Sequence, residues 1–222
     1  FEVGAKTEFA DGKIQLNAAA FIVKYNDKQE EIIRPAAGGG TETIVDNAAS
    51  AETKGVELEL IARATPELTF RAAGAYLSAK YDDFLIPDLA NPGQFVDITN
   101  VANFRRAPKW TGNVGLDYDK ALGDRNSINF NTNLAYLDDF FTSPRRDPTG
   151  RNRDTIAAHT TLDASLAFIH SGDSFKRLRI AVYGRDLLNK GNRITNTLDA
   201  GVFYFGVVSA NREGGVELSI EF

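Results

Sequence analysis

EGGVELSIEF, residues 213–222, decides the fold because its last seven residues alternate without a break between apolar and polar side chains. One side of an extended chain would carry the apolar set Val216, Leu218, Ile220 and Phe222. The other side would carry Glu217, Ser219 and Glu221. Successive side chains of a β-strand point to opposite faces, so this stretch is predicted to be a strand that lies between an apolar and an aqueous medium.

Composition limits what the remainder of the chain can be. The 222 residues carry a formal net charge of −5 and are 43% apolar, and no run approaches the roughly 18 apolar residues that a membrane helix needs. Mild acidity argues against a nucleic-acid partner, because such proteins rely on an excess of Lys and Arg. The absence of Cys excludes disulfides, thiol catalysis and cysteine metal sites. Any contact with a bilayer would therefore be made by strands.

The same alternation predicts nine strands, at 1–9, 13–25, 53–63, 68–81, 110–118, 128–136, 162–168, 178–185 and 216–222. The pattern is sharpest at 53–63, where Glu57 and Glu59 alternate with apolar residues. A slip of one residue would move both carboxylates to the apolar side. If that side is lipid, each charge would cost up to about 2–4 kcal/mol near the midplane, somewhat less for acids, so the register is well specified.

Two of these segments indicate which medium lies on each face. Trp110 and Tyr118 mark the two ends of the apolar row in 110–118, as in a strand whose ends reach both membrane interfaces. Asn129, Asn131 and Asn133 occupy the polar row of the next strand. Three successive asparagines suit a wet lumen and not a dry core.

The connections between these strands are alternately short and long. Short turns are predicted around 10–12, 64–66, 122–124 and 170–173, and long connections at 26–52, 82–108, 142–155 and from about 188. Segments 30–34 and 42–46 are expected to extend the flanking strands, and 201–208 to form the projecting upper half of the terminal strand. Short periplasmic turns and long extracellular loops are typical of transmembrane barrels. The predicted fold is all-β, with antiparallel up-and-down transmembrane β-barrel strands.

An odd strand count indicates that the predicted strands belong to a larger barrel. Bacterial single-chain barrels have an even number of strands, whereas this chain has nine predicted strands, no Met and no signal peptide at its start. Because the first hairpin closes with a short turn, its first strand would run from the outer surface downward. We therefore expect an N-terminal part of the protein to be absent from this chain.

Five stretches together resemble the C-terminal half of the barrel in TonB-dependent outer-membrane receptors. They are TKGVELEL (53–60), TPELTFRAAGAYLSAKYDDF (65–84), APKWTGNVGLDY (107–118), GRDLLNK (184–190) and GGVELSIEF (214–222). One departure is Arg185-Asp186-Leu187, where the family usually has an Asn-Leu pair. The resemblance implies a 22-stranded barrel filled by an N-terminal plug. It also implies TonB-energised import of ferric siderophores, cobalamin or another scarce nutrient across the Gram-negative outer membrane.

The resemblance also implies partners. Residues 1–222 would be the C-terminal part of the barrel, with the plug and the TonB-binding segment absent. The TonB complex would act through that missing N-terminal part. Outer-membrane lipid and lipopolysaccharide would surround the strands, and the barrel-assembly machinery would recognise Phe222 at the end of the chain. No cofactor is implied.

Loop arginines are the candidate ligand-binding residues. Six of them fall on two long connections: Arg105, Arg106, Arg145, Arg146, Arg151 and Arg153. Guanidinium forks suit carboxylate and phosphate ligands, so these residues are hypothesised to recruit an anionic ferric chelate. The alternatives are solvated loops or contacts to lipopolysaccharide phosphates.

Catalytic and metal sites are not expected. The acids Glu57, Glu59, Glu217 and Glu221 are better explained as lumen-facing side chains than as paired catalytic carboxylates. His159 and His170 lie near opposite ends of one predicted strand, which makes a metal pair implausible. An outer-membrane enzyme would need a nucleophile–base pair that the spacing does not support. The remaining alternative is a binding or structural protein, either a small barrel of eight or ten strands or a secreted β-sandwich.

Overall fold

The computed structural model describes residues 1–144, 154–189, 194–199 and 204–222. These residues form strands, turns and irregular connections, without a helix among them. No helix in the described part of the chain is therefore long and apolar enough to cross a membrane.

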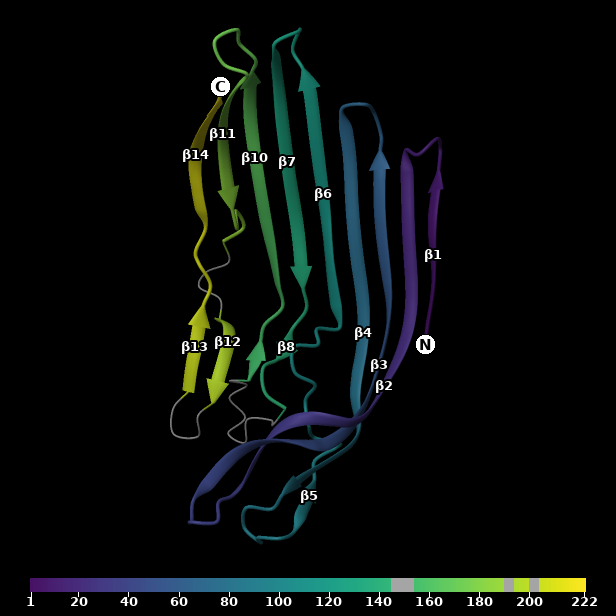
Figure 1. The fold of residues 1–222 in the computed structure, drawn as a ribbon, viewed down its shortest axis with the longest axis vertical. Coiled ribbons are helices and arrows are strands. Elements are labelled where there is room, and N and C mark those ends of the chain that lie inside the picture. The colour runs from purple at the N-terminus through teal and green to yellow at the C-terminus, as the bar shows by residue number, and fades with distance from the viewer. Residues whose placement is uncertain (145–153, 190–193, 200–203) are drawn as a thin grey trace.

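Nine strands lie side by side in chain order in one main sheet (Figure 1). They are β1 (Glu2–Phe9), β2 (Ile14–Pro35), β3 (Thr41–Arg63), β4 (Leu68–Pro87), β6 (Trp110–Ala121), β7 (Asn126–Leu137), β10 (His159–His170), β11 (Arg177–Arg185) and β14 (Glu213–Glu221). A tenth strand, β5 (Phe95–Asp97), pairs with the far end of β4. Every pairing in this sheet is antiparallel. The all-β, up-and-down prediction and its nine strands are confirmed.

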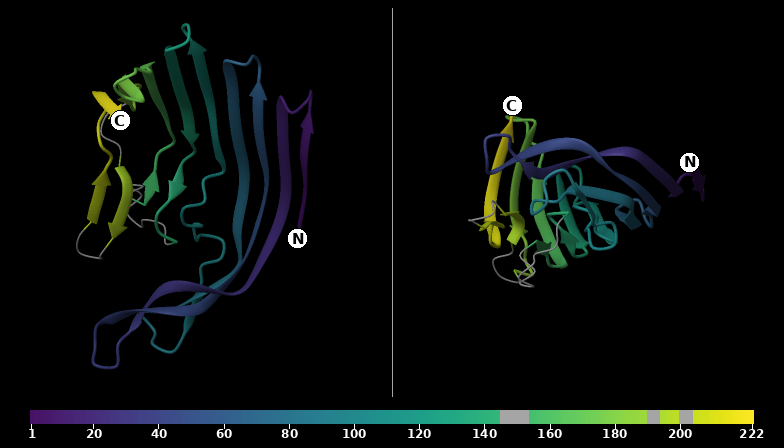
Figure 2. Two further views of the ribbon diagram at one scale, coloured as in Figure 1. Left: turned by 45° about the horizontal axis from the view of Figure 1, so that its top comes forward. Right: turned by 90° about the horizontal axis from the view of Figure 1, so that it is seen from below.

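The main sheet is a single curved layer whose edges do not meet. Figure 2 shows it as an open arc, with the N-terminal and C-terminal strands at opposite edges. Within the described residues β1 pairs only with β2, and β14 only with β11. A small closed barrel would need these edges to pair, and a β-sandwich would need a second sheet across the core. The described sheet supports neither of these alternatives.

The register places apolar side chains in continuous rows across one face. One row crosses six strands through Leu16, Leu60, Ala72, Val114, Leu134 and Leu162. A second row continues to the last strand through Phe130, Leu166, Val182 and Val216. No described part of the chain covers this face, and Val114 and Val216 remain 56% and 73% exposed. Such a face needs an apolar surrounding.

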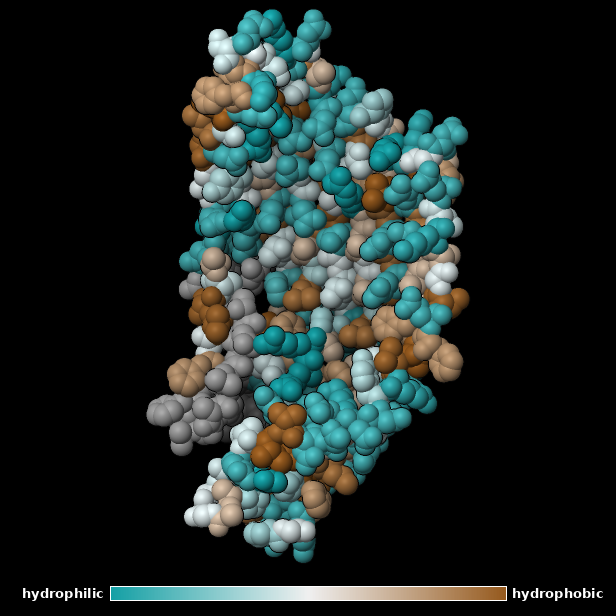
Figure 3. All heavy atoms as spheres, viewed as in Figure 1, coloured by the Kyte–Doolittle hydropathy of each residue, from teal (hydrophilic) through white to brown (hydrophobic). Residues whose placement is uncertain are grey.

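The opposite face of the sheet is polar and cross-linked. Arg71 on β4 forms an ion pair with Asp117 on β6. Arg179 on β11 lies 2.6 Å from Glu217 on β14. Hydrophilic residues predominate over the strands on the face turned to the viewer in Figure 3. The sheet thus separates an apolar side from an aqueous side, as the alternation predicts.

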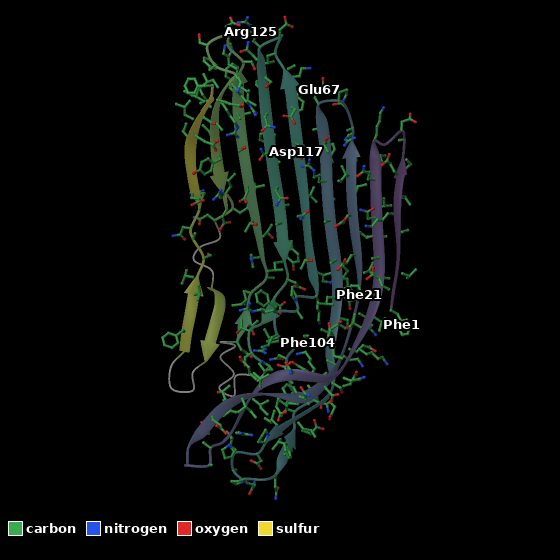
Figure 4. All side chains as sticks on the ribbon, in the orientation of Figure 1. Phe1, Phe21, Glu67, Phe104, Asp117 and Arg125 are labelled. Atoms are coloured by element: carbon green, nitrogen blue, oxygen red, sulfur yellow. The ribbon has the colours of Figure 1, made fainter. Side chains whose placement is uncertain are left out.

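Short turns and long connections lie at opposite ends of the sheet. In Figure 4 Glu67 and Arg125 mark short turns at one end, and Phe104 lies among the long connections at the other. The first turn, at 10–12, has positive φ at three consecutive residues, the last of them Gly12 (φ 77°). Such values match a tight hairpin connection. The predicted alternation of connections is confirmed.

The longest connection continues the ladder of β2 and β3. Pairing runs on from Glu30↔Asp46 to Pro35↔Thr41, so the predicted extensions at 30–34 and 42–46 are confirmed. We call residues 26–52 the arm. Register shifts near Lys28 and Ser50 interrupt the ladder at its base, and such bulges bend strands. The arm bends there and crosses the loop end of the sheet (Figures 1 and 2).

The expectation for residues 201–208 needs correction. Residues 204–208 form β13 (Tyr204–Val208), which pairs with β12 (Ile194–Asp199) in a separate two-stranded sheet. Residues 201–203 lie outside the described part. β14 begins only at Glu213, opposite Arg185. Because β11 ends there, with Asp186 at φ 47°, it offers no partner beyond that point and the chain forms a new hairpin.

Candidate functional site

The loop end of the sheet contains the candidate site. The arm, β5, β8 (Phe140–Phe141), β9 (Thr155–Ile156), β12 and β13 all gather at this end (Figure 1). Loops held by a rigid scaffold commonly carry binding residues. The polar face of the sheet ends at the same loops. A ligand that reached this face from the loop end would therefore contact the loops first.

A small apolar core joins the arm to the neighbouring segments. Its buried members are Ile32, Ala49, Ala51, Tyr81 and Phe84. Residues from the 98–104 segment pack against this core, among them Phe104. The Tyr81 ring lies 4.8 Å from that of Phe84 and 5.0 Å from that of Phe104, centroid to centroid. Three segments that are distant in sequence therefore share one core, which fixes the base of the arm.

Glu30 is buried beside this core, and its carboxylate accepts hydrogen bonds from three side chains. It is only 1% exposed. The Tyr81 hydroxyl donates to Glu30 Oε1 over 2.7 Å, and Arg105 Nη2 donates to Oε2 over 3.1 Å. Lys28 forms an ion pair with Oε1, and its ammonium lies 5.1 Å from the centre of the Phe104 ring. A buried carboxylate needs such partners to offset the loss of its hydration.

Tyr81 is held in its neutral form by the same site. Burial of its ring is the main cause of a raised pKa, and the hydrogen bond to Glu30 and the charge of Glu30 add to it. Arg105 opposes the shift because its positive charge favours the phenolate. The hydroxyl therefore remains a donor, which is the state that a carboxylate acceptor requires.

Arg105 has acidic partners within the arm. Its guanidinium points to Glu30 and also lies 3.5 Å from Glu31, so two acids of the arm already engage it. Arg106 is exposed, with φ 51°, and its backbone N–H donates to Phe141 O over 2.8 Å. Arg105 thus has a structural role at the base of the arm.

The other four arginines cannot be placed beside these two. Arg145, Arg146, Arg151 and Arg153 all fall within residues 145–153, outside the described part of the chain. The hypothesis that the loop arginines bind a ligand therefore stays a prediction.

A second contact ties the 98–104 segment to the next long connection. Asp154 is 7% exposed and accepts a 3.3 Å hydrogen bond from Asn103 Nδ2. Its backbone oxygen accepts one of 2.7 Å from the Thr142 N–H. The Asn103 N–H in turn donates to Pro144 O over 2.9 Å. Residues 98–106 thus link the arm to the third long connection, of which residues 142–144 and 154 make these contacts.

Two of the four acids on the strands, Glu59 and Glu217, have side-chain partners. Asn17 Nδ2 donates to Glu59 over 3.2 Å, and Arg179 pairs with Glu217. His159 bonds the Ala157 carbonyl near the loop end, whereas His170 bonds Asn126 at the opposite end of β10. In the part of the chain that the structure describes, no group of three or more His, Asp or Glu residues could hold a metal ion.

Sequence reasoning missed the Glu30 site. Glu30 is one of several charged residues in a polar stretch, and nothing in its spacing separates it from its solvated neighbours. The usable signal lay in Tyr81, Phe84 and Phe104, because large aromatics within polar connections need somewhere to pack. That signal predicts a small core among the connections, although not which charged residues enter it.

Comparisons with known proteins agree with this architecture. The profile of the family described as "TonB dependent receptor-like, beta-barrel" matches residues 1–187. The ferric yersiniabactin uptake receptor FyuA from Yersinia pestis superposes with a TM-score of 0.72 at 20% identity, over 100% of this chain and 29% of that receptor. The siderophore receptor PiuA from Acinetobacter baumannii gives 0.66 at 17% identity, over 100% and 28%. The ferric-catecholate import receptor Fiu from E. coli gives 0.63 at 15% identity, over 98% and 26%.

These likenesses concern the fold and one part of each receptor. The chain spans 26% to 29% of the lengths of these three proteins. The comparison with curated protein sequences gives no match. The family profile nevertheless covers most of the chain, and the open ladder of antiparallel strands has the form of a barrel wall. The chain belongs to the TonB-dependent receptor-like β-barrel family.

Proposed function

We propose that this chain is part of an outer-membrane receptor that imports ferric siderophores, or another scarce nutrient, with energy supplied through TonB. One observation carries the proposal: the family profile covers residues 1–187 of a sheet with one apolar and one polar face. The names of FyuA, PiuA and Fiu, which describe siderophore or ferric-chelate receptors, support the substrate class. The receptor acts by transport and not by catalysis.

In the proposed orientation the apolar face meets lipid and the short turns face the periplasm. The long connections then face the cell exterior, where a scarce ligand first arrives. Phe222 lies at the short-turn end of the sheet (Figure 1). We propose that it is the signal that the barrel-assembly machinery recognises, since it follows the last strand and is 81% exposed.

Other parts of the receptor complete the barrel in this proposal. The related receptors are more than three times as long as this chain, which covers 29% of FyuA. Residues 1–222 supply the C-terminal barrel wall and its outer loops, within a barrel of 22 strands. The plug and the TonB-binding segment belong to the rest of the receptor, and the plug faces the polar side of the sheet.

Uptake by the whole receptor tests this function. A strain lacking the receptor gene is complemented with the wild-type gene or an empty vector and grown under iron limitation. It is then offered radiolabelled iron on catecholate, hydroxamate and carboxylate chelators, and labelled cobalamin separately. Receptor-dependent uptake of at least one compound, abolished in a tonB deletion strain, is expected. Equal uptake with and without the receptor for every compound would reject the function.

The arginine hypothesis requires its own variants because Arg105 has a structural partner. The test set replaces Arg106, Arg145, Arg146, Arg151 and Arg153 with Gln in the whole receptor and leaves Arg105 intact. If these residues recruit an anionic chelate, its affinity should fall by about tenfold or more, since charge-assisted bonds of about 1.5–3 kcal/mol each are lost. Unchanged affinity would remove these five residues from the site. Arg105→Gln, measured separately, reports on the Glu30 contact instead.

A further inference from the structure

Three lysines gather around one glutamate on the apolar side of the sheet, near the loop end. Lys24 on β2, Lys54 on β3 and Lys80 on β4 place Nζ at 3.9, 3.9 and 4.0 Å from the carboxylate of Glu52. The register pairs Lys24 with Glu52 and Glu52 with Lys80, so the three strands contribute neighbouring side chains. This lysine cluster lies on the same face as Val56 and Tyr76, because its members are an even number of residues away along their strands.

The lysine cluster carries more positive than negative charge, and it has N–H donors that Glu52 does not use. The lysine side chains are 71%, 54% and 57% exposed, whereas Glu52 is 17% exposed. Lys80 also bonds Asp82 over 2.9 Å, so three ammonium groups face two carboxylates. The distances to Glu52 are too long for hydrogen bonds, and each ammonium has three N–H donors. An anionic group with several oxygens could therefore bind across the cluster without displacing an existing hydrogen bond to Glu52.

An aromatic pair lies next to the cluster, toward the short turns. Tyr76 and Trp110 pair across β4 and β6, with ring centroids 4.7 Å apart, and Trp110 is 55% exposed. Amphipathic aromatics concentrate where lipid headgroups meet acyl chains. The pair thus indicates the depth at which a head region ends and a chain region begins.

An apolar hollow of about 540 Å³ continues below the aromatic pair. Leu58, Leu60, Ala72, Gly74, Gly112 and Val114 are among its lining residues. Gly74 pairs directly with Gly112, so two adjacent strands lack side chains at this point. A Cβ added at Gly74 would meet only Thr111 O, at 3.7 Å, which is ordinary contact. The backbone at position 74 would therefore accept a side chain, and the hollow exists because the residue there is glycine.

We propose that the lysine cluster, the aromatic pair and the hollow together bind one molecule of phosphorylated lipopolysaccharide. Its lipid phosphate lies among Lys24, Lys54 and Lys80, and an acyl chain occupies the hollow at Gly74 and Gly112. Lysine clusters beside a membrane surface attract anionic headgroups. Lipopolysaccharide is the anionic lipid of the outer leaflet, and the cluster lies at the end of the sheet that faces outward. The inference rests on the proposed function for that orientation.

The head contact is tested on the purified whole receptor in detergent, with purified lipopolysaccharide and its enzymatically dephosphorylated form as probes. The test variant is K24Q/K54Q/K80Q. The matched control is K13Q/K120Q/K176Q, which removes three exposed lysines near the short turns. Native mass spectrometry should show binding about tenfold weaker in the test variant and unchanged in the control. Dephosphorylated lipid should bind the wild type as weakly as intact lipid binds the test variant.

Two results would overturn the assignment of the head contact. One is equal binding of intact lipopolysaccharide by the wild type and K24Q/K54Q/K80Q. The other is equal binding of the phosphorylated and dephosphorylated forms by the wild type, which would also follow if the face bound a neutral lipid or a second receptor.

The chain contact is tested by filling the hollow. Gly74→Leu should weaken lipopolysaccharide binding several-fold, whereas Ala164→Leu, on the same face in β10 but outside the hollow, should not. Heat-modifiable gel mobility confirms that both variants fold. Retained binding in folded Gly74→Leu would overturn the acyl-chain assignment.

Ferric chelate binding is measured on the same samples. If the wild type binds no ferric chelate, the proposed substrate is rejected. The lipid comparison would still decide the lipid site.

Discussion

Glu30 is the residue on which the loop end depends most. Its side chain is fully buried, and it joins the arm to β4 through Tyr81 and to the 98–106 segment through Arg105. Inside a protein such a network is strong when every member is satisfied and costly when one is removed. Arg105 and Lys28 are each less than half exposed, so losing Glu30 would leave two partly buried cations without their acid.

Replacing Glu30 should release the arm from the sheet. For Glu30→Ala in the whole receptor we expect docking of the arm to weaken by about 3–5 kcal/mol, as for other buried ion pairs that lose one partner. Hydrogen exchange across residues 26–52 measures this directly. Glu42→Ala is the control, since its pair with Arg34 is exposed on both sides and worth less than about 1 kcal/mol. Equal exchange in the two variants would contradict the role of Glu30.

Tyr81 should give the loop end a dependence on alkaline pH. Its pKa is raised by burial and by Glu30, above the value of about 10 expected in an unfolded chain. The neutral form is therefore the one that folding favours: its contribution is complete below about pH 10 and is lost as pH rises above that. Phenolate absorbance of the wild-type and Tyr81→Phe receptors should coincide between about pH 9 and 11. An extra phenolate in the wild type would show that Tyr81 titrates normally.

At the scale of the element, β3 shows how alternation fixes a strand. Val56 and Leu58 lie on the apolar face and are 46% and 51% exposed, while Glu57 and Glu59 lie on the polar face. Leu58 pairs with Ala18 and with Gly74, in the middle of the apolar rows. Between Val56 and Leu60, β3 therefore carries charge on only one of its faces.

A lysine substitution on each face of β3 should show which face lies in lipid and which lies in water. Leu58→Lys should destabilise the receptor by about 2–4 kcal/mol if Leu58 lies near the bilayer midplane. Glu57→Lys, one residue away on the polar face, should change stability by much less, because its surroundings remain aqueous. Unfolding of the receptor in lipid vesicles by urea provides the comparison. Similar losses for both variants would contradict the assignment of the faces.

At the scale of the whole molecule, the sheet has two unpaired edges. The outer sides of β1 and β14 carry backbone donors and acceptors that no described strand satisfies. Exposed edges of this kind pair with other chains, and the uncovered apolar face adds to that tendency. Within the described residues, the sheet thus leaves both of its edges open to pairing with further strands.

Residues 1–222 expressed alone should therefore associate. Refolded into detergent, they should elute as oligomers or aggregates in size-exclusion chromatography with light scattering, whereas the whole receptor should elute as one monodisperse species. The physical reason is the pair of open edges, which the rest of the barrel would close. A stable monomer of residues 1–222 would show that the edges are protected in some other way.

The sequence by itself determined the strands, their order and their two faces. Alternation with a period of two is a local property, and the nine segments that show it became the nine strands of the main path. Only the tertiary structure decided what the connections do. It placed Arg105 against Glu30, 75 residues away, and brought Lys24, Lys54 and Lys80 around Glu52 from three strands. Such contacts depend on register, bulges and loop packing together, which no local pattern encodes.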